Sequence, residues 1–474
     1  KSVTVLHTSR WFNSAVVFSD HQDSILNLAD YSFVKNLEAV AVYNETGKSV
    51  QQEFDTKIKA NTFKEFEIRN YNNDSYLNQL EQINLPFLHD KYFSGNKINI
   101  AVIDGGFLGA DELPAFESLH AENRIKDVHN FLDNSKNVYV NHPHGMYVLS
   151  IMCADLEGNL LGAAPDANYW LLLSENVFSE QIIEEENWIA AAEFADSAGV
   201  DIINTSLGYS LFDNQEQNHS HQDMDGNSTR ITIAADIAAQ KGMLVVNSAG
   251  NSGNEPWKYI TAPSDGYSVL SVGAVDVNGD VATFSSLGPS ADGDIKPNIA
   301  ALGVKVFFQY TNGNLAYGNG TSFASPLAAG LSACLWQAFP DANNMEIFHA
   351  IEKSASQNSN PDHMLGYGIP DAEKAYQILK NLQKVNNEDY MLVYPVPFQD
   401  EITIMLNPKE DSQAHISIFD FSGRKIAENT CELSSEKQNI LSLNQLANQA
   451  AGLYYIKIAT ANHTFQKKII KSLN

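Results

Sequence analysis

The sequence predicts an α/β domain of three layers around a parallel sheet, preceded by a small α+β fragment and followed by a small all-β sandwich. Between residues 84 and 380, short continuously apolar runs alternate with helical segments. Strands that are apolar on both faces and joined by helices are typical of a parallel sheet covered on both sides. After residue 386, apolar and polar residues alternate instead, which is the period of half-buried strands.

Five apolar runs are candidate strands of the parallel sheet, and they lie at residues 98–103, 169–173, 200–204, 243–247 and 269–273. Two helical stretches, at 186–198 and 229–240, each end beside a glycine, as helix C-termini often do. In such sheets, functional side chains collect at the carboxyl ends of the strands. The residues that follow these runs are therefore the first candidates for a functional site.

A chain of 474 residues exceeds one ordinary hydrophobic core, so several parts are expected. The fragment, a polar linker, the α/β domain and the sandwich are predicted at residues 1–44, 45–75, 76–383 and 384–474. Within the fragment, a strand, a helix and a second strand are predicted at residues 12–18, 20–33 and 37–43.

The charge balance excludes some partners. With 57 acidic and 30 basic residues the net charge is -27, which disfavours nucleic acid and anionic lipid surfaces. An uncharged stretch at residues 322–339 is long enough to span a membrane, but its Ser, Gly, Ala and Pro content favours a helix buried in protein, so no transmembrane segment is expected. No signal peptide is visible after Lys1, so we expect a chain that has already been trimmed.

The three cysteines, Cys153, Cys334 and Cys431, lie far apart in the sequence. They form neither a disulfide framework nor a zinc motif. Cysteine usage therefore says nothing about the compartment.

Three residues of the types that together activate a serine nucleophile follow a strand or begin a helix. Asp104 comes directly after the first apolar run, in VIDGG, His144 opens the helical segment HGMYVLS, and Ser322 lies in GNGTSFASP, where a small-residue helix begins. A serine hydroxyl becomes a good nucleophile when an imidazole takes its proton and a carboxylate holds that imidazole in the right tautomer. The sequence thus predicts a triad of these three residues.

Each of these residues has a simpler interpretation when taken alone. An aspartate after a strand, or a His-Gly pair, more often caps an element or satisfies a hydrogen bond in the core. The chain order Asp, His, Ser on a parallel α/β pattern favours the catalytic interpretation, because it is one of the few orders known for such triads. His142, two residues before His144, is a rival general base.

Asn251 is a candidate for the oxyanion hole. It lies in VNSAGNSG, after the apolar run at 243–247. Its amide can donate a hydrogen bond to a developing oxyanion beside the backbone N–H of Ser322, near a helix N-terminus. The simpler interpretation is a turn residue, because Gly and Asn favour turns.

Together these segments resemble the subtilisin-like serine peptidases, the subtilases, over about residues 77–377. The Ser322 segment is the most specific match, and three further matching stretches are INTSLG at 203–208, SVGAV at 271–275 and FSSLGP at 284–289. The resemblance implies a subtilisin-like three-layer domain and a serine endopeptidase that forms an acyl-enzyme on Ser322.

The resemblance also implies where a peptide substrate binds. Ser206, Leu207 and Gly208 would be the edge to which substrate backbone adds as a strand, a common mode of peptide recognition. The pocket for the side chain before the scissile bond would lie between this edge and two further segments, Ala249-Gly250-Asn251 and residues 261–263. These segments contain no carboxylate, so an apolar or medium-sized side chain is expected.

Two positions depart from the family pattern. Gly105 follows Asp104, where many subtilases have serine or threonine, and Met146 stands where threonine is usual after His-Gly. Neither residue transfers a proton, so activity is still expected, although the support of His144 is expected to differ.

The flanking parts resemble accessories of exported peptidases. Residues 10–42 resemble the second half of a subtilase propeptide, with a maturation site within 45–75; an unrelated structural arm is the alternative. The C-terminal part, with YPVP, IFDFSGR, GLYYI and KKIIK, resembles a type IX secretion sorting domain. Such domains direct proteins of some Gram-negative bacteria across the outer membrane; a carbohydrate-binding or adhesion sandwich is the alternative.

No cofactor is expected for catalysis. Calcium is common in subtilases, and residues 223–227, DMDGN, have carboxylates at alternate positions before a glycine, as calcium loops do. They lack the distal glutamate of such a loop, so a turn is the favoured interpretation and no metal ligand is assigned.

The sequence therefore predicts an exported serine endopeptidase whose partners are protein substrates, its own propeptide and an outer-membrane secretion machinery. Two rival functions stay open. One is a binding or adhesion protein that keeps the scaffold without turnover, and the other is an esterase or amidase that uses the same triad on small substrates.

Overall fold

The computed structural model divides into two compact units, Lys1–Gln377 and Ile378–Asn474. The residues that the structure describes are 3–42, 67–68, 77–387, 390–394, 396, 398, 401–408, 410–435, 439–447, 449–461 and 464–472.

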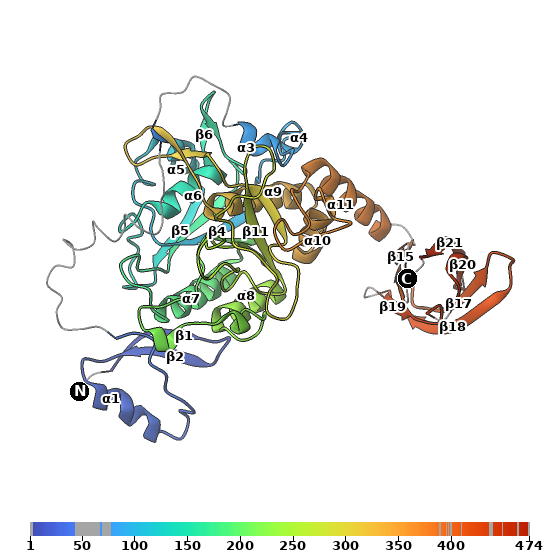
Figure 1. The fold of residues 1–474 in the computed structure, drawn as a ribbon, viewed down its shortest axis with the longest axis horizontal. Coiled ribbons are helices and arrows are strands. Elements are labelled where there is room, and N and C mark those ends of the chain that lie inside the picture. The colour runs from blue at the N-terminus through green and yellow to red at the C-terminus, as the bar shows by residue number, and fades with distance from the viewer. Residues whose placement is uncertain are drawn as a thin grey trace. The chain divides into compact units, whose positions relative to one another are not determined.

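A parallel sheet of seven strands forms the centre of the first unit, in the order β12-β11-β10-β9-β4-β8-β5 (Figure 1). The strands are β4 (Asn99–Asp104), β5 (Ile125–Asn130), β8 (Asn168–Leu173), β9 (Ile202–Thr205), β10 (Leu244–Ser248), β11 (Val269–Val275) and β12 (Ile299–Leu302). The five predicted strands are β4 and β8 to β11. The edge strands β5 and β12 were not predicted, because β5 is polar and half-buried and β12 is a short run directly after Pro297 and Asn298, which are typical of turns.

Two pairs of helices cover the sheet on opposite sides, which gives the predicted three layers (Figure 1). Helices α7 (Ile183–Ala198) and α8 (Arg230–Gln240) pack on each other and on the sheet. Helices α6 (His144–Cys153) and α9 (Thr321–Ala338) form the other pair. Among the described residues, no helix is long and apolar enough to cross a membrane.

The fold brings the predicted site residues to one edge of the sheet. Asp104 is the last residue of β4, and Ser206 follows the last residue of β9. His144 is the first residue of α6, and Ser322 is the second residue of α9. Carboxyl ends of parallel strands meet at the same edge, so these side chains converge although they are far apart in the sequence.

The N-terminal fragment is a hairpin and a helical turn: β1 (Thr4–Ser9), β2 (Ser14–Phe18), α1 (Gln22–Leu26) and the 3-10 turn η1 (Asn27–Asp30). β1 was not predicted from the sequence. The strand predicted at 37–43 is wrong for its described residues 37–42, which pair with no strand. The Ile183 N–H instead donates to the Val40 carbonyl at 2.9 Å, so the backbone of this segment bonds to the start of α7.

Part of the predicted linker joins the first unit. Residues Glu67–Ile68 form strand β3, which pairs antiparallel with β14 (Leu315–Gly318) in a small sheet with β13 (Val306–Gln309). The rest of residues 45–75 lies outside the described residues.

The second unit is a small antiparallel sandwich, as predicted. One sheet has the order β15-β16-β19 and the other β18-β17-β20-β21. The strands are β15 (Tyr390–Tyr394), β16 (Ile402–Asn407), β17 (Ser412–Asp420), β18 (Lys425–Leu433), β19 (Asn439–Leu443), β20 (Gly452–Ala459) and β21 (Thr464–Lys471). Both sheets contribute to one core, which includes Ile404 and Ile456. Helix α11 (Ala372–Asn387) crosses the division between the units.

Candidate active site

Asp104 and His144 form a buried hydrogen-bonded pair. His144 Nδ1 lies 2.7 Å from Asp104 Oδ1, which also accepts the N–H of Gly105 at 2.8 Å. The Asp104 side chain is 0% exposed and that of His144 is 13% exposed. A carboxylate that accepts from Nδ1 holds the imidazole in the tautomer whose Nε2 carries the basic lone pair.

Glycine permits the close approach of β4 and α6. The Gly145 N–H donates to the Gly106 carbonyl at 2.9 Å. A Cβ on Gly145 would lie 2.6 Å from that carbonyl oxygen and 2.9 Å from the Asp104 Cβ. Any larger residue after His144 would push α6 away from Asp104, so the His-Gly pair has a direct geometric cause.

His142, the alternative candidate for the general base, accepts a backbone hydrogen bond in the structure. Its Nδ1 accepts the backbone N–H of His144 at 3.2 Å, at the start of α6. Burial, together with the neighbouring His144, lowers the pKa of His142 to about 4, although Asp104 opposes the shift. At neutral pH His142 is therefore a neutral acceptor for a first-turn N–H, a group that helices leave without an internal partner.

Ser322 and its two neighbours in the sequence all contact other segments of the site. It is 8% exposed, and its Oγ lies 3.5 Å from the Ser206 carbonyl oxygen. The ring of Phe323, the next residue, has its centroid 6.2 Å from that of His144. Thr321, the residue before, is hydrogen-bonded to Asn251. The structure thus brings together the four segments that the sequence singled out.

The carbonyl of Ser322 has an unusual partner. Pro326, four residues later in α9, has no N–H to donate to it. The hydroxyl of Ser206 donates to this carbonyl instead, at 3.0 Å. Because Ser206 begins the predicted substrate edge, this bond ties that edge to the backbone of Ser322.

Thr321 fixes the orientation of Asn251. Asn251 Oδ1 accepts both the backbone N–H and the hydroxyl of Thr321, each at 2.9 Å. With its oxygen engaged, the amide has its NH₂ end left to donate, and it lies beside the first turn of α9. The role of Thr321 was not predicted; its place directly before the serine was the signal.

The three segments predicted to form the substrate pocket meet at Thr261. A Cβ on Gly208 would lie 2.1 Å from Thr261 Oγ1, and one on Gly250 would lie 3.2 Å from the same atom. Ala249 and Leu207 are buried beside them, and the Tyr209 N–H donates to the Ala262 carbonyl at 2.8 Å. At both glycines the Thr261 side chain occupies the space that a Cβ would need.

Glu175 is a neighbour of the triad that sequence reasoning missed. A Cβ on Gly105 would lie 2.7 Å from Val177 Cγ1 and 3.2 Å from Glu175 Oε2. The space that a serine or threonine would fill after Asp104 is therefore taken by the segment after β8. Burial and the charge of Asp104 raise the pKa of Glu175 to about 7, although His144 opposes the shift. The unusual glycine was the available signal.

The segment at 223–227 is a turn that engages its own carboxylates. Asp223 Oδ2 accepts the Ser220 N–H at 2.6 Å, and Asp225 Oδ1 accepts the N–H of Asn227 at 2.9 Å and of Ser228 at 2.7 Å.

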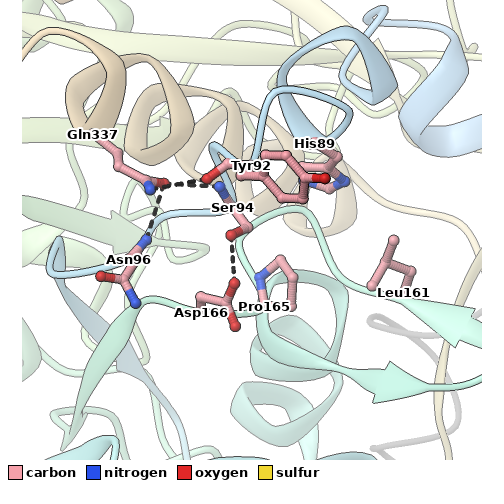
Figure 2. A pocket seen from close by; sticks show the side chains of 8 residues that line it. All are labelled: His89, Tyr92, Ser94, Asn96, Leu161, Pro165, Asp166 and Gln337. Atoms are coloured by element: carbon pink, nitrogen blue, oxygen red, sulfur yellow. Dashed lines mark hydrogen bonds between the residues drawn. The ribbon is translucent and has the colours of Figure 1, made fainter.

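A surface pocket of about 390 Å³ lies far from this site (Figure 2). Gln337 Oε1 accepts three backbone N–H groups in its wall, those of Ser94, Gly95 and Asn96. Gln337 is fifteen residues after Ser322 in α9, or about 22 Å along the helix. The pocket is at the amino ends of the strands, opposite the triad.

A buried Asp-His pair beside a serine at a helix start, on a three-layer parallel α/β fold, is the arrangement on which serine hydrolases rely. The chain matches the Subtilase family over residues 95–368, more than half of its length, and a Secretion system C-terminal sorting domain over residues 392–472. The chain therefore belongs to the subtilase family.

Similar proteins agree with this assignment. The chain is 29% identical over 297 residues to the thermostable alkaline protease of Halalkalibacterium halodurans, covering 62% of this chain and 72% of that protein. It is 27% identical over 302 residues to subtilisin E of Bacillus subtilis, covering 63% and 70%.

Two solved structures share the fold. The prenylagaramide maturation protease PagA has a TM-score of 0.50 at 22% identity, covering 62% of this chain and 98% of that one. MycP1 from the ESX-1 type VII secretion system has a TM-score of 0.51 at 20% identity, covering 66% and 90%.

The family defines the function. The chain is an exported serine endopeptidase of the subtilase family, and its sorting domain indicates secretion or surface localisation by the type IX system. These conclusions confirm the function predicted from the sequence.

We expect His144 to titrate above its ordinary pKa of 6.5. Burial alone lowers the pKa of His144, but the charge of Asp104, its hydrogen bond and the charge of Glu175 together raise it. Histidine NMR on the Ser322→Ala protein measures this midpoint. Asp104→Asn should lower it, and a midpoint at or below 6.5 that Asp104→Asn does not move would contradict the geometry.

The activity should follow the same titration. Only the neutral imidazole can take a proton, so kcat/KM falls as the pH falls through the pKa of His144. Because this pKa is raised, the acid limb of the pH profile should lie above pH 6.5.

A second prediction concerns the bond between Ser206 and the Ser322 carbonyl. In the Ser322→Ala background, Ser206→Ala should lower the free energy of unfolding by about 1–3 kcal/mol, because a buried carbonyl loses its donor. Pro326→Ala should recover part of this loss, since residue 326 then has an N–H in position to donate. Denaturant unfolding of the four proteins in a double-mutant cycle measures the coupling. Strictly additive losses would show that the two residues do not share this carbonyl.

Proposed function

We propose that Ser322 is the nucleophile of this endopeptidase, that His144 is its general base and acid, and that Asp104 holds His144 in position. The observation that carries the proposal is the buried 2.7 Å bond between His144 Nδ1 and Asp104 beside the start of α9. The bond leaves Nε2 as the basic nitrogen and stabilises the imidazolium that forms during the reaction.

The proposed reaction has two halves. Ser322 Oγ attacks the carbonyl carbon of the scissile peptide bond while His144 Nε2 takes the hydroxyl proton. The tetrahedral oxyanion accepts hydrogen bonds from the Ser322 N–H and Asn251 Nδ2, and its collapse passes the proton to the leaving amine. Water then attacks the acyl-enzyme with His144 again as base, which releases the acid and restores Ser322.

An extended peptide is the substrate that this site fits best. Its backbone would add to the edge Ser206-Leu207-Gly208 as a strand. Its side chain before the scissile bond would enter a pocket bounded by Gly208, Gly250 and Thr261, which lie close together. The uncharged lining supports a preference for apolar or medium-sized side chains.

The N-terminal fragment is proposed to be the chain's own propeptide. Glu193 on α7 accepts the backbone N–H groups of Arg10 at 2.9 Å and Trp11 at 3.2 Å, and the hydroxyl of Ser9. The Val42 N–H donates to Gln181 Oε1 at 3.1 Å, in the segment that follows β8 beside the triad. A fragment that docks on α7 and leads toward the site has the placement of an inhibitor that must be removed.

Outer-membrane export from a Gram-negative bacterium is the proposed route to the cell surface or medium. The support is the sorting domain at residues 392–472 together with the acidic, globular composition.

A fluorophosphonate probe tests the nucleophile. We expect the chain processed between residues 44 and 76 to label at Ser322, as shown by mass spectrometry of the modified peptide, and the unprocessed chain to label more slowly. Labelling that persists in Ser322→Ala would locate the nucleophile elsewhere.

The oxyanion hole is tested by kinetics. Asn251→Ala should lower kcat by about 10²–10³, a magnitude known from subtilisin itself, with little change in KM, because the amide donates chiefly to the transition state. Thr321→Val, which keeps the backbone N–H that orients Asn251, should lower kcat less. An unchanged kcat in Asn251→Ala would remove Asn251 from the oxyanion hole.

A further inference from the structure

Three glutamates gather beside the triad, between β8 and α7. Glu175 and Glu180 lie in the segment after β8, and Glu184 lies in the first turn of α7. One carboxylate oxygen of each lies within 4.8 Å of those of the other two. Like charges this close repel each other strongly where water is excluded, so the cluster needs something to offset its charge.

Glu184 is the buried member of the cluster. Its side chain is 0% exposed, and both carboxylate oxygens lack a hydrogen bond from the described residues. The N–H groups of Asn176 and Gln181 are near enough to lower its pKa but lie outside hydrogen-bonding geometry. A buried carboxylate is normally paired, hydrogen-bonded or bound to a metal.

The next two residues of α7 are also buried glutamates, and each lies beside a basic side chain. Glu185 lies 2.6 Å from His219 Nε2, and Glu186 lies 2.5 Å from Arg230 Nε. Both therefore have a cationic or protonatable partner. Within the described part of the chain, Glu184 has none.

Two hydroxyls near the cluster are also without a partner. Tyr209 OH and Ser174 Oγ are fully buried, and neither has a hydrogen bond among the described residues. Tyr209 interacts electrostatically with all three glutamates, and Ser174 directly precedes Glu175. These orphaned oxygens are an observation independent of the acidic cluster, because hydroxyl oxygens can complete the shell of a hard cation.

The electrostatic surroundings are almost entirely acidic. Within the part of the chain that the structure describes, no lysine or arginine forms an ion pair with Glu175, Glu180 or Glu184. The cluster therefore has no cationic lysine or arginine partner to offset its charge.

We propose that Glu175, Glu180 and Glu184 bind one calcium ion. Carboxylate oxygens are the ligands that calcium prefers, with bonds of about 2.3–2.6 Å. Ligands on opposite sides of such an ion are separated by about 4.8 Å, so three oxygens within that distance of one another can share it. Magnesium suits this cluster less well, because it usually keeps several waters and uses few protein carboxylates.

The ion would hold the wall of the active site. It joins the first turn of α7 to the segment after β8, whose Ser174 N–H donates to the Asp104 carbonyl at 3.2 Å and whose Val177 fills the space beside Gly105. It would also offset the charge of Glu175 next to Asp104. Calcium binding at this place is thus a structural support of the triad and takes no part in the proton transfers.

Calcium binding is measured on the full-length Ser322→Ala protein, so that neither catalysis nor self-cleavage affects the result. After treatment with a chelator, added Ca²⁺ should raise the unfolding temperature by about 5–10 °C at saturation. Terbium, which replaces calcium and emits when an aromatic side chain lies nearby, should luminesce through Tyr209 or Trp188 and be displaced by Ca²⁺.

Glu184→Gln tests the assignment, with Glu186→Gln as a matched control on the same helix. Without calcium, Glu184→Gln should unfold at the same or a higher temperature than its parent, because the Glu184 carboxylate oxygens have no hydrogen-bond partner among the described residues to lose. With calcium, it should lose most of the upward shift and the terbium signal, whereas Glu186→Gln should keep both. Glu180→Gln, at a half-exposed position, should give the same loss if Glu184→Gln does not fold.

Three outcomes would overturn the proposal. If calcium does not raise the unfolding temperature of the parent, the cluster does not bind calcium and its carboxyl groups share protons instead. A calcium response that Glu184→Gln and Glu180→Gln both retain would place the ion elsewhere. A loss of cleavage after basic residues in the active Glu180→Gln enzyme, with an unchanged calcium response, would assign the cluster to substrate side chains. Each of these results is separate from labelling of Ser322, so failure of one proposal does not decide the other.

Discussion

The bond between Asp104 and His144 is the interaction on which the rest of the site depends. A fully buried carboxylate is costly unless its charge is used, and here it accepts from the imidazole and from its neighbouring N–H. The bond requires β4 and α6 to touch, which the glycines at 106 and 145 permit. It also requires α6 to begin at His144, where His142 accepts the first-turn N–H. The close contact that carries this bond thus accounts for the glycines at 106 and 145.

A second constraint couples substrate binding to the nucleophile. Pro326 removes the donor that an ordinary helix would offer to the carbonyl of Ser322, and Ser206 replaces it. The backbone of Ser322, the proposed nucleophile, is therefore held by the residue that begins the predicted substrate edge. On the other side, Thr321 holds the amide of Asn251. Hydrogen bonds thus connect the proposed nucleophile to two segments of the predicted substrate pocket.

Negative charge surrounds this site to an unusual degree. Glu175 lies against the segment that follows Asp104, and its pKa is raised first by burial and then by the charge of Asp104. The same charge helps to raise the pKa of His144, which favours work at neutral to alkaline pH. Gly105 departs from the family pattern, in which serine or threonine is common. Glu175 and Val177 occupy the space that such a hydroxyl-bearing side chain would take.

The sequence by itself determined the layers of the fold, because strands that are apolar on both faces and helices that end at glycine produce patterns visible without coordinates. It also determined the candidate residues Asp104, His144, Asn251 and Ser322, because each stands at a strand end or helix start. The edge strands β5 and β12 were beyond it, since β5 is polar without a regular alternation and β12 is a short apolar run directly after Pro297 and Asn298, residues typical of turns. Only the tertiary structure showed that His144 bonds to Asp104 whereas His142 accepts a backbone N–H, revealed that Ser206 donates to a carbonyl of α9, and brought Glu175, Glu180 and Glu184 together. Hydrogen-bond partners and electrostatic neighbours depend on distances across the fold, which no local pattern of residues contains.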